Sequence, residues 1–345
     1  MATAGQNKAV RSVPFKIWLK AWWEGYDPVE FANYLDKKRA AAAPSPPAPA
    51  AEAEPKSPPR DAPSDVTPDD LELPFDPWDA NRVEIAQYIW GEGYCGPGGP
   101  EHIISMCKLL ALSPEMSLLE IGANLGGPAR TLADKYGTWV TGYETSERLV
   151  KLANEKSLMA GLAKKADVRH YSTGSTEGFG RHFDRALAKE SLFTIENKAN
   201  ILGLVEEHLK PSGLFLITDF VLGSDQVSGK ESFRTWRDKE SEKRRPYMVT
   251  AQELAGLVKK ARFNVRVNED VSATYIDLIN RAWAGADKVA AQLARKEDSE
   301  DLLKALLKEA EFWSNRARML ESGDLRLWRI LASKRSEKPS MLSDW

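Results

Sequence analysis

Apolar and polar positions along the chain predict strands that alternate with helices. Short apolar runs typical of buried strands occupy residues 117–122, 139–144, 167–171, 183–188, 214–220, 263–267 and 325–332. Segments with helical features lie between them, at residues 128–136, 146–160, 196–209 and 250–260. The helix at 146–160 begins at Thr145 or Ser146, and the helix at 250–260 begins with the capping-box residues Thr250 and Glu253. This alternation predicts an α/β fold with a parallel sheet and helices on both faces.

Two segments are longer than such a sheet requires. Residues 222–248 follow the fifth predicted strand, and residues 274–322 follow the sixth. The second segment is largely helical, with Leu302, Leu303, Leu306 and Leu307 at helical spacing. Insertions at these places lie above the carboxyl ends of the strands, where ligands bind. We therefore expect both segments to form a helical lid over a substrate.

The remaining chain divides into parts of different composition. Residues 1–39 form a short arm rich in tryptophan, which we expect to be helical after Asp27 and Pro28. Residues 40–70 are rich in Ala, Pro, Ser and charge, and we expect a disordered tether because they hold almost no large apolar side chain. The folded body is expected at 71–338, followed by a tail at 339–345.

The arm at residues 12–39 suits two kinds of contact. Its tryptophans and basic side chains are typical of helices that lie on a membrane surface. The alternative, which we favour, is docking on a protein surface through Trp18 and Trp22. The tether is compatible with both contacts, because it keeps the arm close without fixing its position.

Charge and cysteine content exclude several classes of function. The chain has 345 residues, with 48 Lys and Arg against 50 Asp and Glu, so it has no excess of positive charge for general nucleic-acid binding. Its two cysteines, Cys95 and Cys107, and four scattered histidines predict no disulfide framework and no metal site. The N-terminal part lacks a long apolar run, so we expect neither a secretory signal nor a membrane span. The expected location is the cytoplasm, either free or at a membrane surface.

The segment Leu118 to Arg130 holds the main chemical signal. It runs from a strand through the glycines Gly122, Gly126 and Gly127 into a helix, and glycine lets the backbone approach a ligand closely. The next predicted strand ends in Glu144, where a carboxylate binds ribose hydroxyls in nucleotide-binding sheets. Together these two signals predict a cofactor that contains a nucleoside.

The motifs along the body resemble those of class I S-adenosylmethionine-dependent methyltransferases. The resemblance rests on residues 90–94, 96–99, the Gly122 loop, residues 188–195, 210–213 and 320–331, and it covers roughly residues 78–334. The nearest subgroup contains phosphoethanolamine, sterol and related small-molecule methyltransferases. The resemblance implies a Rossmann-like seven-stranded sheet and S-adenosyl-L-methionine as the cofactor.

The resemblance also implies roles for particular residues. Trp90 and Tyr94 precede the first strand and are expected to close over the cofactor or the substrate, although Trp90 fits core packing equally well. Glu190 and Tyr94 are the two candidates for a general base, and the sequence does not choose between them. The residues expected to bind the cofactor are Glu120, Gly122, Asn124, Gly126, Glu144, Thr145, Ser172 and Lys189.

Three positions depart from the pattern of these enzymes. Asn124 replaces the middle glycine of the cofactor loop, and asparagine tolerates the left-handed backbone angles that such a turn needs. Ser172 to Ser175 stand where an acidic residue usually contacts adenine, so Ser172 or backbone groups take that place. Thr194 replaces a histidine of the base machinery in the phosphoethanolamine enzymes, which makes phosphoethanolamine a poor candidate for the acceptor.

Together these features predict methyl transfer to a small-molecule or lipid-like acceptor beneath a helical lid. A different class of function, favoured by Asn124 and Ser172, is a methyltransferase-fold scaffold or assembly protein that no longer turns over. An RNA methyltransferase fits less well, because the net charge is only −2.

Overall fold

The computed structural model describes residues 77–174 and 177–335. The chain divides into two units, Met1–Phe75 and Asp76–Trp345, and the fold below belongs to the second. The predicted arm at 1–39, the tether at 40–70 and the tail at 339–345 lie outside the described residues.

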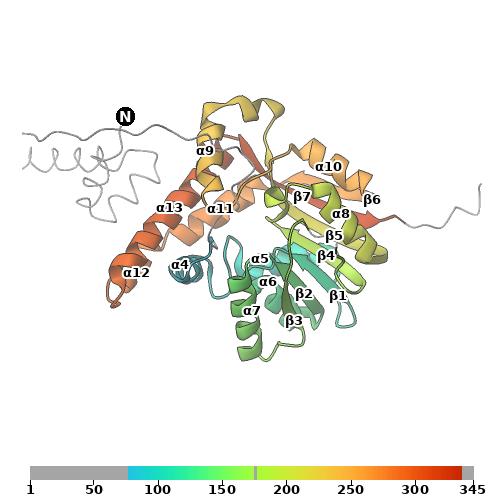
Figure 1. The fold of residues 1–345 in the computed structure, drawn as a ribbon, viewed down its shortest axis with the longest axis horizontal. Helices are drawn as coiled ribbons and strands as arrows, with labels where there is room; N and C mark the ends of the chain where they lie inside the picture. The colour runs from blue at the N-terminus through green and yellow to red at the C-terminus, as the bar shows by residue number, and fades with distance from the viewer. Residues whose placement is uncertain (1–76, 175–176, 336–345) are drawn as a thin grey trace, which may run out of the picture. The chain divides into compact units, whose positions relative to one another are not determined.

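Seven strands of the described residues form one sheet with the order β3-β2-β1-β4-β5-β7-β6 (Figure 1). The strands are β1 (Ser117–Ile121), β2 (Trp139–Glu144), β3 (Ala166–His170), β4 (Phe183–Lys189), β5 (Leu209–Leu222), β6 (Phe263–Asp270) and β7 (Leu325–Lys334). All seven predicted strands are present, and the predicted Rossmann-like α/β fold is confirmed.

The sheet is mixed, so the predicted parallel pairing holds for five of the seven strands and not for the whole sheet. Strands β1 to β5 pair in parallel, whereas β7 runs antiparallel to both β5 and β6. The first residue of β7, Leu325, pairs with Leu222, the last residue of β5. After β6 the chain therefore enters β7 at the carboxyl edge of the sheet and must run back across it.

Helices cover both faces of the sheet. Figure 1 shows α5 (Gly99–Cys107), α6 (Gly127–Tyr136) and α7 (Glu147–Met159) on one side, with α8 (Lys198–His208) and α10 (Ala251–Lys260) on the other. Apolar side chains of α8 and α10 pack against the strands in a buried core that includes Phe183, Phe215 and Phe263.

Side-chain caps fix where several of these helices begin. The hydroxyl of Ser146, rather than that of Thr145, accepts a hydrogen bond from the Leu149 N–H at the start of α7. The predicted capping box is present at α10, where Thr250 and Glu253 bond each other's backbone N–H groups. Each bond satisfies an N–H group that the helix itself leaves unpaired.

The helix predicted at 196–209 is present as α8, which starts two residues later and ends one residue earlier than predicted. Helix α8 ends at His208, and β5 starts at Leu209, so residues 210–213, one of the segments that carry the resemblance, lie inside this strand. Within the folded body, no element was predicted before the first strand, where the structure has α4 (Ala80–Trp90) and α5.

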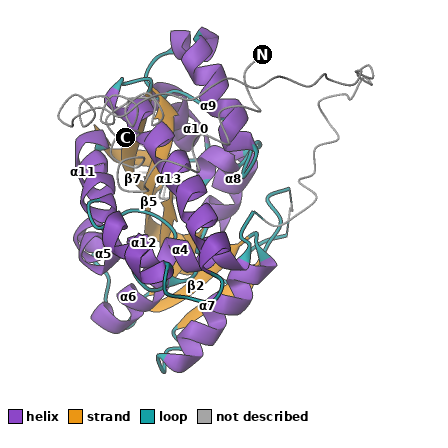
Figure 2. Cartoon of the chain, turned by 90° about the vertical axis from the view of Figure 1, so that its left-hand side faces the viewer, coloured by secondary structure: helices purple, strands orange, loops and turns teal. Residues whose placement is uncertain are grey.

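The two long segments lie on the carboxyl side of the strands that precede them. The first contains α9 (Glu231–Ser241), and the second contains α11 (Ser272–Trp283), α12 (Ala286–Leu293) and α13 (Ser299–Glu321). Helix α13 contacts α4, α9, α11 and α12, and Figure 2 shows α4, α12 and α13 in front of the strands. None of the helices in the described ranges is long and apolar enough to cross a membrane.

Candidate active site

The order of the strands creates a crevice between β1 and β4. From β1 the chain proceeds to β2 and β3 on one side, and β4 and β5 continue the sheet on the other. Ligands bind at such switch points, outside the carboxyl ends of the strands. Ile121 pairs with Ala188, so the Gly122 loop that follows β1 lies beside the end of β4 and Glu190.

The Gly122 loop has the tight geometry that its sequence predicts. Gly122 has φ +76° and donates its N–H to the Tyr143 carbonyl at 2.8 Å. A Cβ at Gly122 would lie 2.5 Å from the Cβ of Ser191, whose hydroxyl donates to the Ile121 carbonyl at 2.9 Å. A larger residue at position 122 would therefore push the loop away from the end of β4.

Asn124 preserves the turn although it replaces a glycine. Its φ is +49°, in the left-handed region, and its side-chain amide donates to the Gly122 carbonyl at 2.9 Å. Asparagine accepts these angles more readily than most residues because its short side chain can bond the local backbone. Gly126, with φ +69°, is the residue that precedes α6.

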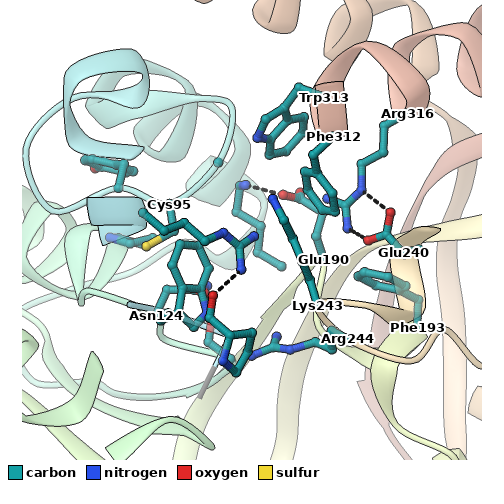
Figure 3. A pocket seen from close by; sticks show the side chains of 18 of the residues that line it. Cys95, Asn124, Glu190, Phe193, Glu240, Lys243, Arg244, Phe312, Trp313 and Arg316 are labelled. Atoms are coloured by element: carbon teal, nitrogen blue, oxygen red, sulfur yellow. Dashed lines mark hydrogen bonds and ion pairs between the residues drawn. The ribbon is translucent and has the colours of Figure 1, made fainter. Parts of the chain in front are cut away.

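A pocket opens above this loop (Figure 3). Its inner half, next to the sheet, contains six of the predicted site residues: Tyr94, Glu120, Gly122, Asn124, Lys189 and Glu190. The predicted residues Gly126, Glu144, Thr145 and Ser172 do not line it. Ser172 is exposed on the loop after β3, so its predicted contact with adenine has no support in the pocket's lining.

Glu120 is the most unusual carboxyl group in the inner half. Only 1% of the residue is exposed, and burial raises its pKa to about 8, against the opposing pull of Lys189 and Arg130. Its Oε2 atom has no hydrogen-bond partner among the described residues. A buried acceptor without a donor is costly, and a cationic amine in the pocket would satisfy it.

Glu144 holds the Gly122 loop and the start of α7 together. Its Oε2 accepts the Asn124 N–H at 2.9 Å, and its Oε1 accepts the N–H groups of Thr145 at 2.8 Å and Ser146 at 3.1 Å. Arg244 places a guanidinium nitrogen 3.6 Å from Oε1. Glu144 therefore lies at the predicted end of β2, but behind the pocket wall.

Glu190 faces the pocket in a fixed orientation. Its φ is +48°, and its backbone N–H donates to the Thr218 carbonyl at 2.7 Å. Oε2 accepts hydrogen bonds from the Lys189 ammonium at 2.5 Å and the Tyr275 hydroxyl at 3.1 Å. Within residues 77–174 and 177–335, Oε1 accepts only from the Thr218 hydroxyl, at 3.3 Å.

The aromatic residues before β1 take different places. The ring of Tyr94 lines the pocket, but its hydroxyl shares a 2.6 Å hydrogen bond with Thr131, and burial raises its pKa to about 12. Trp90 does not line the pocket and packs against Trp313 and Trp283, with ring centroids 4.6 Å and 6.2 Å away. Of the two roles expected for Trp90, the structure therefore supports core packing.

The outer half of the pocket comes from side chains that the sequence analysis did not identify. They are aromatic or charged and belong to α4 and the residues just before it, to the turn after β4 and to the two long segments: Trp78, Arg82, Phe193, Glu240, Lys243, Arg244, Tyr275, Phe312, Trp313 and Arg316. One signal in the sequence could have indicated α13: three of its side chains, Glu309, Trp313 and Arg316, are spaced by three or four residues and so share one face of the helix.

Two ion-pair clusters stabilise the outer half. Arg316 pairs with Glu240 in a buried contact, and its guanidinium lies 4.3 Å from the Phe312 ring centroid. Glu309 accepts from Arg82 at 3.1 Å and from Lys243 at 2.7 Å. These two cations outweigh the effect of burial and lower the pKa of Glu309 to about 2. The clusters join α4, α9 and α13 around the pocket.

Comparison with known proteins agrees with this architecture. Residues 102–267 match the family model of a methyltransferase domain. Phosphoethanolamine N-methyltransferase 1 of Zea mays is 25% identical over 252 residues, which cover 71% of this chain and 47% of that protein. The Plasmodium falciparum phosphoethanolamine N-methyltransferase is 28% identical over 203 residues, covering 57% of this chain and 72% of that one. This chain thus spans about half the length of the maize relative.

A solved structure has the same fold. Phosphoethanolamine N-methyltransferase 2 of Haemonchus contortus, in complex with S-adenosyl-L-methionine, superposes with a TM-score of 0.64 and 19% identity. The match covers 74% of this chain and 57% of that chain.

Proposed function

Because the chain carries a class I S-adenosylmethionine-dependent methyltransferase domain, we propose that it transfers a methyl group to a small-molecule or lipid-like acceptor in the outer half of the pocket. The observation that carries the proposal is the unpartnered Oε2 of Glu120, buried beside the Gly122 loop. This oxygen would accept a hydrogen bond from the amino group of the cofactor's methionine part. Glu144 is the carboxylate that would bind the ribose hydroxyls.

The residues around Glu190 are suited to accept a proton from the acceptor. When bound, S-adenosyl-L-methionine supplies a methyl group that its sulfonium has already activated. Lys189 and Tyr275 occupy Oε2 of Glu190, so Oε1, with one hydrogen bond of 3.3 Å, is the atom free to take the proton. The Tyr94 hydroxyl is engaged by Thr131, which favours Glu190 as the general base.

The lining of the outer half supports a small or lipid-like acceptor. The rings of Phe193, Phe312 and Trp313 provide apolar walls that exclude water and align a nucleophile. Thr194 lies outside the pocket, and its hydroxyl donates to the Ser191 carbonyl at 2.8 Å. With no histidine at this position, phosphoethanolamine is not the acceptor we favour.

The proposal is tested by following the methyl group. The full chain is incubated with methyl-tritiated S-adenosyl-L-methionine and, separately, a water-soluble metabolite extract, a total lipid extract and phosphoethanolamine. We expect label in a product of one of the two extracts.

The role of Glu190 is tested with the same assay. Glu190→Gln should reduce the rate of methyl transfer at least a hundredfold, because a positioned general base accelerates a reaction by a factor of about 10²–10⁴. Tyr94→Phe is the matched control and should keep most activity. The proposal fails if no small molecule or lipid is labelled, and Glu190 loses its role if Glu190→Gln matches wild type.

A further inference from the structure

Arg244 covers the carboxylate assigned to the ribose. Glu144 is only 1% exposed and does not line the pocket, whereas Arg244 lines it with a side chain that is 30% exposed. The guanidinium lies 3.6 Å from Oε1 of Glu144. A ligand in the pocket thus meets Arg244 before it can reach Glu144.

The hydrogen bonds of Glu144 leave little room for a further partner. A carboxylate oxygen accepts about two hydrogen bonds. Oε1 already accepts from the N–H groups of Thr145 and Ser146 and from the Thr145 hydroxyl at 3.2 Å, and Oε2 accepts from the N–H of Asn124. The three N–H donors belong to the backbone of the loop and the helix start, so they cannot leave without unfolding the site. Of the two side-chain partners, Arg244 is the one that lines the pocket and that a bound ligand can displace.

The backbone around Arg244 is anchored on both sides. Its own N–H donates to the Glu240 carbonyl at 2.9 Å, and the preceding Lys243 pairs with Glu309. Further on, the Tyr247 N–H donates to the Phe193 carbonyl at 2.7 Å. Movement at this place is therefore restricted to the Arg244 side chain.

We propose that Arg244 is a further residue of the cofactor site, one that sets cofactor affinity by covering Glu144 until ribose hydroxyls displace its guanidinium. The inference rests on the proposed function, because it takes Glu144 as the ribose carboxylate. The competition is modest in size. A partly exposed ion pair contributes up to about 1 kcal/mol, so its removal should tighten binding about two- to fivefold.

Calorimetric titration of the full chain with S-adenosylhomocysteine tests this inference. Arg244→Ala and Arg244→Gln should each bind it about two- to fivefold more tightly than wild type. Arg245→Ala is the matched control: it removes the same charge one residue away, from an exposed side chain outside the pocket, and should bind like wild type. Thermal melting of each variant shows whether the fold is intact, and the Gln variant serves if the Ala variant does not fold.

A second probe distinguishes competition at the ribose from a general change in charge. The 2′,3′-dideoxy analogue of S-adenosylhomocysteine lacks the hydroxyls that would displace Arg244, so Arg244→Ala should not improve its binding. Weaker or unchanged binding of S-adenosylhomocysteine by both Arg244 variants would overturn the inference, as would an equal gain in Arg245→Ala or for the analogue. If wild type and every variant fail to bind, the proposed function itself fails.

Discussion

Glu120 is a carboxyl group that the fold has placed where ionisation is difficult. Desolvation raises its pKa to about 8, although Lys189 and Arg130 oppose the shift. Near neutral pH the group therefore holds a proton in the ligand-free protein. A cationic amino group beside it favours the ionised form, so binding of such a group and loss of the proton are linked.

This linkage predicts a pH-dependent cofactor affinity. Because the ligand's ammonium pairs with ionised Glu120, affinity for S-adenosylhomocysteine should fall about tenfold for each pH unit below about 8. Calorimetry at pH 6, 7 and 8, in buffers of different ionisation enthalpy, should detect proton release on binding at pH 7. Glu120→Gln should bind weakly at every pH. A constant affinity in wild type between pH 6 and 8 would show that Glu120 does not hold the amino group.

The site residues that could be predicted are those that directly follow a predicted strand. Gly122 and Asn124 follow one strand, Glu190 follows another, and parallel strands bring these ends to one edge. Side-chain direction could not be predicted in the same way. Tyr94 was a candidate base, but its hydroxyl bonds Thr131, a contact between residues 37 positions apart.

Among the elements, α13 contributes most to the outer half of the pocket. One face of this helix carries Trp313, Arg316 and Glu309, and Glu309 binds Arg82 of α4 and Lys243 of the segment after α9. A buried carboxylate between two cations ties three elements, and losing it would leave both cations without their partner.

Glu309 should therefore matter for stability. Glu309→Gln should lower the free energy of unfolding by about 3 kcal/mol, as expected when one member of a buried ion pair is removed. Its folded pKa of about 2 lies below the unfolded value, so this stabilisation is present above about pH 4.5 and is lost as pH falls toward 2. Urea titrations at pH 7 and pH 3 measure both effects.

Glu311 provides the control for this prediction. Glu311 lies on α13, like Glu309, and pairs with Lys239 of α9 at 2.9 Å. Both side chains are exposed, so Glu311→Gln should change stability by less than about 1 kcal/mol. Equal effects of the two substitutions would contradict the role given to Glu309.

The direction of β7 marks a limit of the sequence pattern at this scale. The apolar run at 325–332 predicted a strand, and a strand is present. The direction of β7 depends on the edge of the sheet to which the helical segment α11–α13 returns the chain. Neither apolar alternation nor helix periodicity encodes that edge. The same long segment supplies Tyr275, Phe312 and Arg316, which is why this part of the pocket was missed.

In the methyltransferase unit as a whole, the two halves of the pocket come from different kinds of sequence. The inner half follows a local motif shared with the family, and it was predicted together with the fold. The outer half is assembled from residues 78–82, 193, 240–244, 275 and 312–316, which are far apart in the sequence and are brought together by the packing of the fold. The residues proposed to bind the acceptor can therefore be identified only from the packing of the fold, whereas those proposed to bind the cofactor can be identified from the motif.

Calorimetric titration of the full chain with S-adenosyl-L-methionine tests the central claim most directly. We predict saturable binding of one molecule per chain in wild type. Gly122→Val should abolish it, because a side chain at this position collides with Ser191 and moves the loop that shapes the site. Asn124→Gly should retain binding, since the left-handed turn suits glycine as well. Failure of wild type to bind S-adenosyl-L-methionine at millimolar concentration would contradict the account and favour a scaffold that has kept only the fold.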